Sequence, residues 1–64
     1  MPIAQITIIE GRSPEKRAAA MKEVAEALSR TLDAPLESIR VILNEVPAFH
    51  WSVGGKPKGE PPSD

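Results

Sequence analysis

Apolar residues gather in two short segments of the chain, separated by one long amphipathic segment. The first segment, Ile3 to Ile9, follows a proline and is dense in β-branched residues, with apolar side chains at odd and even positions. This pattern is typical of a β-strand with apolar groups on both faces. We therefore predict a strand over residues 3–9, and one helix is too little to cover both of its faces.

A helix start follows the break at residues 10–12. Ser13 can act as the N-cap, Pro14 suits the first helical position, and Glu15 places a carboxylate near the positive end of the helix. Apolar residues then recur at helical spacing along one face: Ala18, Met21, Val24, Ala25, Leu28 and Leu32. The pattern predicts one amphipathic helix of about 20 residues.

A second strand is predicted over residues 39–46. Pro35 ends the helix near Asp33, and the segment after residue 38 alternates, with Val41 and Leu43 on one face and Ile42 on the other. A helix of this length between two strands is long enough for a crossover connection, which makes the strands parallel and the turn right-handed. The predicted fold class is therefore α+β, built as a two-layer β-α-β unit.

Length and composition limit what can stabilise this unit. A chain of 64 residues is at most one domain, and it buries only about 60% of the surface of its unfolded form. It has no cysteine and a single histidine, so disulfides, thiolate metal sites and histidine clusters are excluded. Two strands under one helix leave open edges and an uncovered apolar face, which we expect other copies of the chain to cover.

The carboxy-terminal segment lacks large apolar residues. We predict a single domain over residues 1–64, with a core at 2–55 and a flexible tail at 56–64. Gly54 and Gly55 could turn a short hairpin, whereas prolines at 57, 61 and 62 argue against regular structure beyond them.

The net charge of −1 argues against a general nucleic-acid binder, because phosphate contacts demand a surplus of basic residues. No apolar run approaches the length of about 18 residues that a membrane span needs, and the amino terminus lacks the pattern of a secretory signal. We therefore expect a cytoplasmic protein. Small anionic ligands remain possible because they need only local arginines.

The most unusual chemical group is at the start of the chain. Methionine before a small residue such as Pro2 is commonly removed, which would leave a secondary amine at Pro2. Burial against apolar groups and nearby cations would lower the pKa of that amine toward neutral pH, where it becomes an effective general base. The alternative is that Pro2 merely begins an edge strand, where its missing N–H does no harm.

Arg12 and Arg40 are the candidate cations. Arg12 follows the first strand, and Arg40 opens the second among apolar neighbours. A guanidinium binds a carboxylate through two parallel hydrogen bonds, so two arginines suit a diacid or keto acid. The alternative for each arginine is a surface ion pair, with Glu10 or Glu37 as partner.

Trp51 is the third candidate. An indole in so small a chain typically packs an interface, but it could also form the wall of a dry pocket. His50 beside it is expected to be an exposed polar residue.

Together these residues resemble 4-oxalocrotonate tautomerase, of the tautomerase superfamily. The likeness runs from Pro2 to about Gly55. It rests on residues 2–6 (PIAQI), 9–13 (IEGRS), 32–36 (LDAPL) and 40–42 (RVI), and on the closing glycine pair.

The resemblance implies a β-α-β protomer, dimers that join their sheets into four strands, and a homohexamer built as a trimer of dimers. It also implies a cofactor-free isomerase of aromatic hydrocarbon catabolism, which needs no metal and acts on a small dicarboxylate or keto acid. Pro2 would move a proton from the 2-hydroxyl of a dienol such as 2-hydroxymuconate to a distant carbon of the same substrate.

The resemblance further assigns the binding residues. Arg12 would hold the far carboxylate, and Arg40 of a neighbouring protomer would hold the 2-keto end. The main-chain N–H of Ile9 would face a substrate oxygen. Trp51 would form the aromatic wall, where phenylalanine is the more familiar residue.

Two alternatives stay open. Related proteins with the same amino-terminal proline hydrate or dehalogenate small unsaturated acids, which calls for a further residue to activate water, and Glu45 has no spacing argument for that role. The chain could also be an oligomeric module that keeps the fold without the chemistry.

Overall fold

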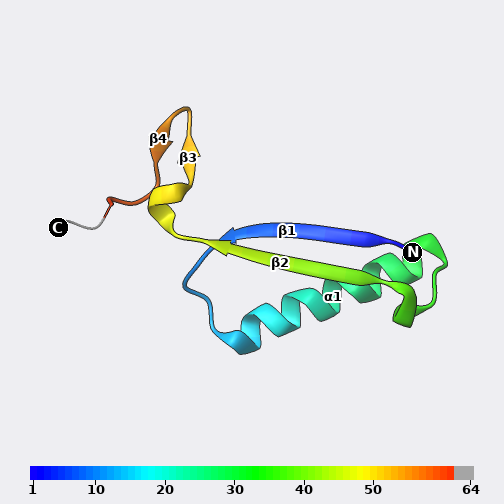
Figure 1. Cartoon of the computed structure of the whole chain (residues 1–64). Coiled ribbons are helices and arrows are strands. Elements are labelled where there is room, and N and C mark those ends of the chain that lie inside the picture. Colours follow the sequence, from blue (N-terminus) through cyan, green and yellow to red (C-terminus); the bar gives the residue numbers. More distant parts are fainter. Residues whose placement is uncertain (62–64) are drawn as a thin grey trace.

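A computed structural model describes residues 1–61 of the chain, and its elements follow the predicted order. Strand β1 spans Ile3–Ile9, helix α1 spans Pro14–Leu32 and strand β2 spans Arg40–Val46. The strands are parallel neighbours in one sheet, and the helix lies against one side of it (Figure 1). The predicted two-layer β-α-β fold is confirmed.

Both ends of α1 are set by the residues that the sequence indicates. The hydroxyl oxygen of Ser13 accepts a hydrogen bond from the main-chain N–H of Lys16 at 3.2 Å, and Pro14 is the first helical residue. At the other end Asp33 takes the left-handed conformation (φ 57°), which turns the chain out of the helix. A short 3₁₀ turn, η1 (Leu36–Ser38), then leads into β2.

The strand register separates the side chains into two faces. Ala4 pairs with Val41 and Ile6 with Leu43, and all four are half-buried on the face that α1 covers. The predicted alternation of β2 is therefore confirmed. Ile39, just before β2, is the one buried residue among residues 1–61, with 8% of its surface exposed.

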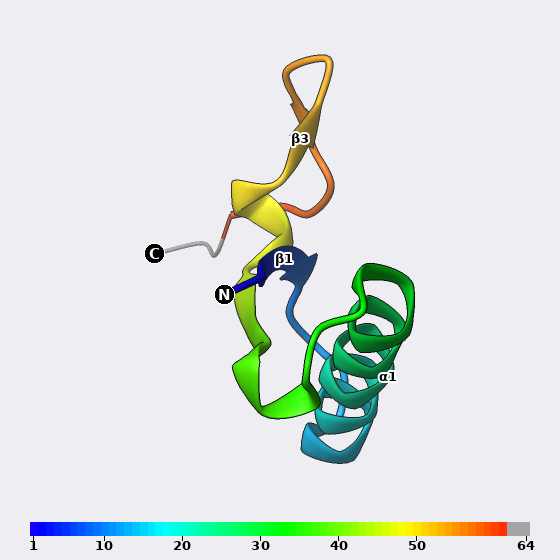
Figure 2. The ribbon, with the colours of Figure 1, turned by 90° about the vertical axis from the view of Figure 1, so that its right-hand side faces the viewer.

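The opposite face of the sheet is open in the single chain. Ile3 is 59% exposed and Ile42 is 43% exposed, and Figure 2 shows α1 on only one side of the strands. Fully burying a side chain of this size stabilises a fold by about 1.5–3 kcal/mol. An isolated chain lacks much of this contribution at Ile3 and Ile42.

The hairpin predicted at Gly54 and Gly55 is confirmed, but the prediction that the residues after Gly55 lack regular structure is wrong. A 3₁₀ turn, η2 (Ala48–His50), leads into a hairpin whose strands are β3 (Ser52–Val53) and β4 (Lys56–Pro57), joined at Gly54 and Gly55. Both glycines have positive φ, as a tight turn requires. Pro57 is accommodated because β4 is an edge strand, where the N–H that proline lacks is not needed. The remaining tail residues, 62–64, lie outside the described part of the chain.

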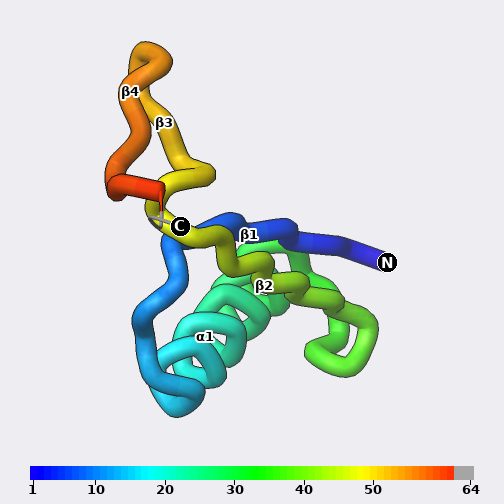
Figure 3. The backbone as a smooth tube through the Cα atoms, turned by 60° about the vertical axis from the view of Figure 1, so that its left-hand side comes forward, coloured from blue at the N-terminus to red at the C-terminus, as the bar shows by residue number. Residues whose placement is uncertain are grey.

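The hairpin projects beyond the end of the sheet, as the tube drawing also shows (Figure 3). The chain measures 49 × 26 × 14 Å with a radius of gyration of 15.1 Å. A compact domain of this length would have a radius of gyration of about 11 Å. The protomer is therefore an elongated body with large surfaces free for contact.

Candidate active site

Pro2 lies half-buried directly before β1. Its carbonyl oxygen accepts a hydrogen bond from the main-chain N–H of Arg40 at 3.0 Å, which extends the β1–β2 ladder to the first residue after Met1. Met1 itself is 81% exposed. The proline is therefore held in place by β2, while the methionine that caps its nitrogen projects into solvent.

The guanidinium of Arg40 bonds a main-chain oxygen and no carboxylate. Its Nη1 donates to the carbonyl of Glu37 at 2.9 Å. Within residues 1–61 no salt bridge joins Arg40 to Glu37 or Arg12 to Glu10. The alternative of surface ion pairs with these two carboxylates is thus not realised in this part of the chain, and both guanidinium groups keep their charge available for an anionic ligand.

Arg12 lies in the loop between β1 and α1, at the far end of the sheet from Pro2. Gly11 before it has a φ of 133°, a conformation that side chains rarely adopt, and this lets the chain turn sharply after the strand. The Nη1 of Arg12 donates a long hydrogen bond of 3.4 Å to the carbonyl of Ile9. The arginine is exposed and close to the end of β1.

The main-chain N–H of Ile9 points to the outer edge of β1. Glu10, the next residue, donates its N–H to the carbonyl of Val46 at 2.8 Å, toward β2. Successive N–H groups of a strand point to opposite sides, so that of Ile9 faces away from β2. Within the described residues no third strand occupies that edge, and a donor is free there.

Trp51 lies between η2 and the hairpin, near the same end of the sheet as Arg12. Its main-chain N–H donates to the carbonyl of Ala48 at 3.1 Å, and its main-chain carbonyl accepts from the main-chain N–H of Lys58 at 2.7 Å. The side chain is half-buried. His50 is exposed, as expected, and packs edge-on against Phe49 with ring centroids 4.5 Å apart.

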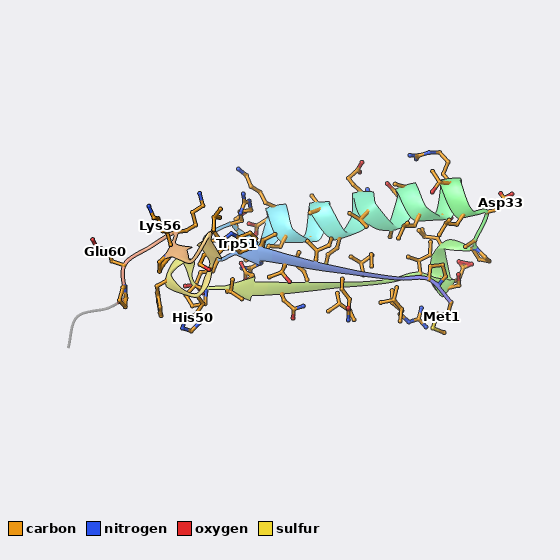
Figure 4. All side chains as sticks on the ribbon, turned by 90° about the horizontal axis from the view of Figure 1, so that it is seen from above. Met1, Asp33, His50, Trp51, Lys56 and Glu60 are labelled. Atoms are coloured by element: carbon orange, nitrogen blue, oxygen red, sulfur yellow. The ribbon has the colours of Figure 1, made fainter. Side chains whose placement is uncertain are left out.

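The predicted residues thus form two groups at opposite ends of one chain. Pro2 and Arg40 lie at one end, and Ile9, Arg12 and Trp51 at the other. Figure 4 shows Met1 far from Trp51, at the other end of the strands. A rise of about 3.3 Å per residue separates Pro2 from Ile9 by about 23 Å. A small acid cannot span that distance, so one chain does not bring all five residues to one substrate.

A single chain also lacks an enclosed site. Residues 1–61 form no pocket, and they hold no group of three histidine, aspartate or glutamate side chains that could bind a metal ion. None of their helices is long and apolar enough to cross a membrane.

One contact was not indicated by the sequence. Arg17 of α1 forms an ion pair with Glu45 of β2 at 2.8 Å. The two residues are far apart along the chain, and only the packing of the helix on the sheet brings them together. Glu45 is therefore engaged and does not stand free as an acid that could activate water.

Known proteins are similar in sequence to this chain over most of its length. Residues 2–60 match the family described as "Tautomerase enzyme". A 2-hydroxymuconate tautomerase of Pseudomonas putida is 54% identical over 57 residues, which cover 89% of this chain and 90% of the relative. A 2-hydroxymuconate tautomerase of Stutzerimonas stutzeri is 57% identical over 56 residues, with 88% and 89% covered.

A solved structure shares the fold as well. A heterohexamer 4-oxalocrotonate tautomerase from Chloroflexus aurantiacus J-10-fl matches with a TM-score of 0.88 at 40% identity, covering 91% of this chain and 94% of that one. The resemblance drawn from the sequence is confirmed. The chain belongs to the tautomerase family.

Proposed function

We propose that this chain is a keto–enol tautomerase that converts an enol or dienol acid such as 2-hydroxymuconate to its conjugated 2-oxo acid. Relatives that are identical to it at more than half of the aligned positions are named 2-hydroxymuconate tautomerase. The observation that carries the proposal within the structure is the placement of Pro2. It is fixed to β2 through Arg40 at the point where loss of Met1 exposes its nitrogen.

Pro2 acts as the general base. After Met1 is removed, its neutral secondary amine takes the proton from the 2-hydroxyl group and becomes a secondary ammonium. It returns a proton to a distant carbon of the same substrate, and the double bonds move to give the 2-oxo-3-enedioate. Proton transfer by a positioned base contributes about 10²–10⁴-fold in rate. The same proton carrier is regenerated, so the reaction calls for no cofactor.

The two arginines bind and polarise the substrate. Arg12 holds the far carboxylate and draws electron density toward it, and Arg40 of a neighbouring protomer holds the carboxylate and oxygen at the 2-keto end. Both guanidinium groups are free of carboxylate partners within the described residues, which supports these roles. The N–H of Ile9 donates to a substrate oxygen, and Trp51 walls the site.

The active site is assembled between copies of the chain. The separation of Pro2 from Arg12 and Trp51 in one chain supports a homo-oligomer in which the Pro2 end of one protomer meets the Arg12 end of another. The open apolar face and the free strand edges supply surfaces for such contacts. We propose a homohexamer, with sheets joined in dimers and three dimers per particle, in which residues 1–64 form one domain.

The proposed setting is the cytoplasm and the breakdown of aromatic compounds, where dienol acids of this kind arise. Of the alternatives, a hydratase or dehalogenase would need a free acid or polar group to activate water. Glu45, the residue considered for that role, is bound by Arg17. Tautomerisation needs no such group.

The test compares purified protein that lacks Met1 with a Pro2→Ala variant, using 2-hydroxymuconate and following the product by ultraviolet absorbance. We expect kcat to fall by about 10²-fold or more in the variant, because the rigid secondary amine is lost. Equal rates would overturn the proposal. Halide release from a haloacrylate, without ketonisation, would identify a dehalogenase instead.

A further inference from the structure

Arg17 joins three elements through a single nitrogen. Its Nη1 donates to a carboxylate oxygen of Glu45 on β2 at 2.8 Å and to the main-chain carbonyl of Arg12 at 3.3 Å. Both side chains of the ion pair are more than two-thirds shielded from solvent, with 29% and 27% of their surface exposed. The guanidinium therefore connects the first turns of α1, the strand β2 and the loop that carries Arg12.

That contact is the main-chain anchor of the loop at Arg12. On one side Glu10 is fixed to Val46, and on the other the helix begins with the bond from the N–H of Arg17 to the carbonyl of Ser13. Between these points, within the described residues, the only hydrogen bond to the main chain of Gly11 or Arg12 comes from Arg17. Gly11 permits many conformations, so an anchor is needed to hold Arg12 in one of them.

Charge pairing gives the contact a second effect. Glu45 neutralises Arg17, whereas Arg12 has no carboxylate partner in the described part of the chain. An incoming carboxylate at this end of the sheet therefore meets one uncompensated guanidinium in the loop.

We infer that Arg17, held by Glu45, is a positioning residue that fixes Arg12 for the far carboxylate of the substrate. This inference rests on the proposed function and adds to it a determinant of specificity for dicarboxylates. It also explains why an ion pair, and not an apolar contact, links α1 to this end of β2. An apolar residue could pack the helix but could not bond the carbonyl of Arg12.

The experiment measures kcat and KM of Arg17→Met and Arg17→Lys on two dienols. One is 2-hydroxymuconate, and the other is a 2-hydroxydienoate without the far carboxylate. Methionine keeps an apolar stem but no donor, whereas the lysine ammonium can donate to both acceptors from one nitrogen. Arg30→Met, on the same helix near its other end, is the matched control.

We expect Arg17→Met to raise KM for 2-hydroxymuconate by about fivefold, a modest change suited to a partly exposed contact. The kinetics on the monocarboxylate should stay within about twofold of the parent, because only the far carboxylate meets Arg12. Arg17→Lys should keep KM for 2-hydroxymuconate close to the parent value. Glu45→Gln should raise KM as Arg17→Met does, and Arg30→Met should leave it unchanged.

A double-mutant cycle separates positioning from general stability. In an Arg12→Ala background, Arg17→Met should have no further effect on KM for 2-hydroxymuconate, because the group that it positions is gone. Additive losses, or equal losses on both substrates together with a lower melting temperature, would overturn the inference. If Arg12→Ala itself leaves the turnover of the dicarboxylate unchanged, the proposed role of Arg12 fails. If Arg12→Ala impairs turnover and Arg17→Met does not, the inference alone fails.

Discussion

The main-chain N–H of Arg40 donates to the carbonyl of Pro2 at 3.0 Å, so the first residue after Met1 is already part of the sheet. Removing Met1 leaves this bond intact and exposes the proline nitrogen at a fixed position. Pro2 can therefore be held in the sheet and still present a free nitrogen, because its carbonyl accepts the hydrogen bond and its nitrogen takes no part in it.

Retention of Met1 should abolish activity without disturbing assembly. With Met1 present the nitrogen of Pro2 is an amide, which has no basic lone pair. Protein expressed while methionine aminopeptidase is inhibited would retain Met1, as intact mass can verify. We expect this form to have the same particle size by light scattering as the trimmed protein, and no tautomerase activity above background. Full activity of the uncleaved form would contradict the general-base role of Pro2.

Mixed oligomers should recover activity from two strongly impaired variants. We expect Pro2→Ala and Arg12→Ala subunits, denatured, mixed in equal amounts and refolded together, to reach about a quarter of the parent activity. In random assembly about one site in four would combine an intact proline from one copy with an intact arginine from another. Variants mixed without refolding are the control. No gain on refolding would mean that both residues act within one chain.

The same mixing with Pro2→Ala and Arg40→Ala tests the assignment of Arg40 to a neighbouring protomer. Recovery of activity is expected if Pro2 and Arg40 of a site come from different copies. Absence of recovery in this pair, beside recovery in the first pair, would assign Arg40 to the same chain as Pro2.

Replacing Ser13 should weaken the start of α1. Its hydroxyl oxygen accepts from the N–H of Lys16, a helix donor with no partner in the helix. We expect Ser13→Ala to lower the free energy of unfolding by about 1 kcal/mol in urea denaturation at a fixed protein concentration. Ser13→Asp keeps an acceptor and should retain most of the stability. Equal losses in both variants would contradict the capping role.

Gly59→Ala should disturb the hairpin against η2. A Cβ built on Gly59 would lie 2.8 Å from the Cβ of Ala48, closer than real side chains approach. We expect a loss of about 1–3 kcal/mol and a shift in the emission of Trp51, which is the only tryptophan and is bound to the neighbouring Lys58.

The matched rescue for that variant is Ala48→Gly. Removing the opposing methyl group gives the new side chain room, so the double variant should regain much of the lost stability and the parent emission. Failure of the rescue would show that the clash with Ala48 is not the cause.

A charge on the open face of the sheet should break the particle apart. Ile42 is 43% exposed in the single chain, and in the proposed oligomer this face is covered by other copies. We expect Ile42→Asp to give smaller particles in light scattering, because an unpaired buried charge is costly. Lys22→Asp, on an exposed part of α1, should leave the size unchanged. An intact particle in the Ile42 variant would mean that the face stays in contact with water.

Local sequence was enough to predict most of the fold. β-branched residues placed β1 at residues 3–9, and the Ser13–Pro14 pair set the start of α1, both as observed. These features depend on neighbours along the chain. Backbone preference, capping and periodicity act over a few residues, so a single sequence carries them.

The sequence was less informative after Gly55. Proline content argued against structure there, yet Lys56 and Pro57 form β4. An edge strand tolerates proline, and whether a strand lies at an edge depends on what packs beside it. Composition alone therefore wrongly predicted that this segment has no regular structure.

The sequence by itself determined the two strands and the helix of the β-α-β unit, their order and the residue types able to do proton-transfer chemistry. Only the tertiary structure showed that Pro2 lies beside Arg40, and that Arg17 reaches both the loop of Arg12 and Glu45. The reason is physical: helix and strand preferences arise from capping, side-chain shape and periodicity among near neighbours along the chain. The distance between remote side chains is instead fixed by how a rigid helix packs on a rigid pair of strands.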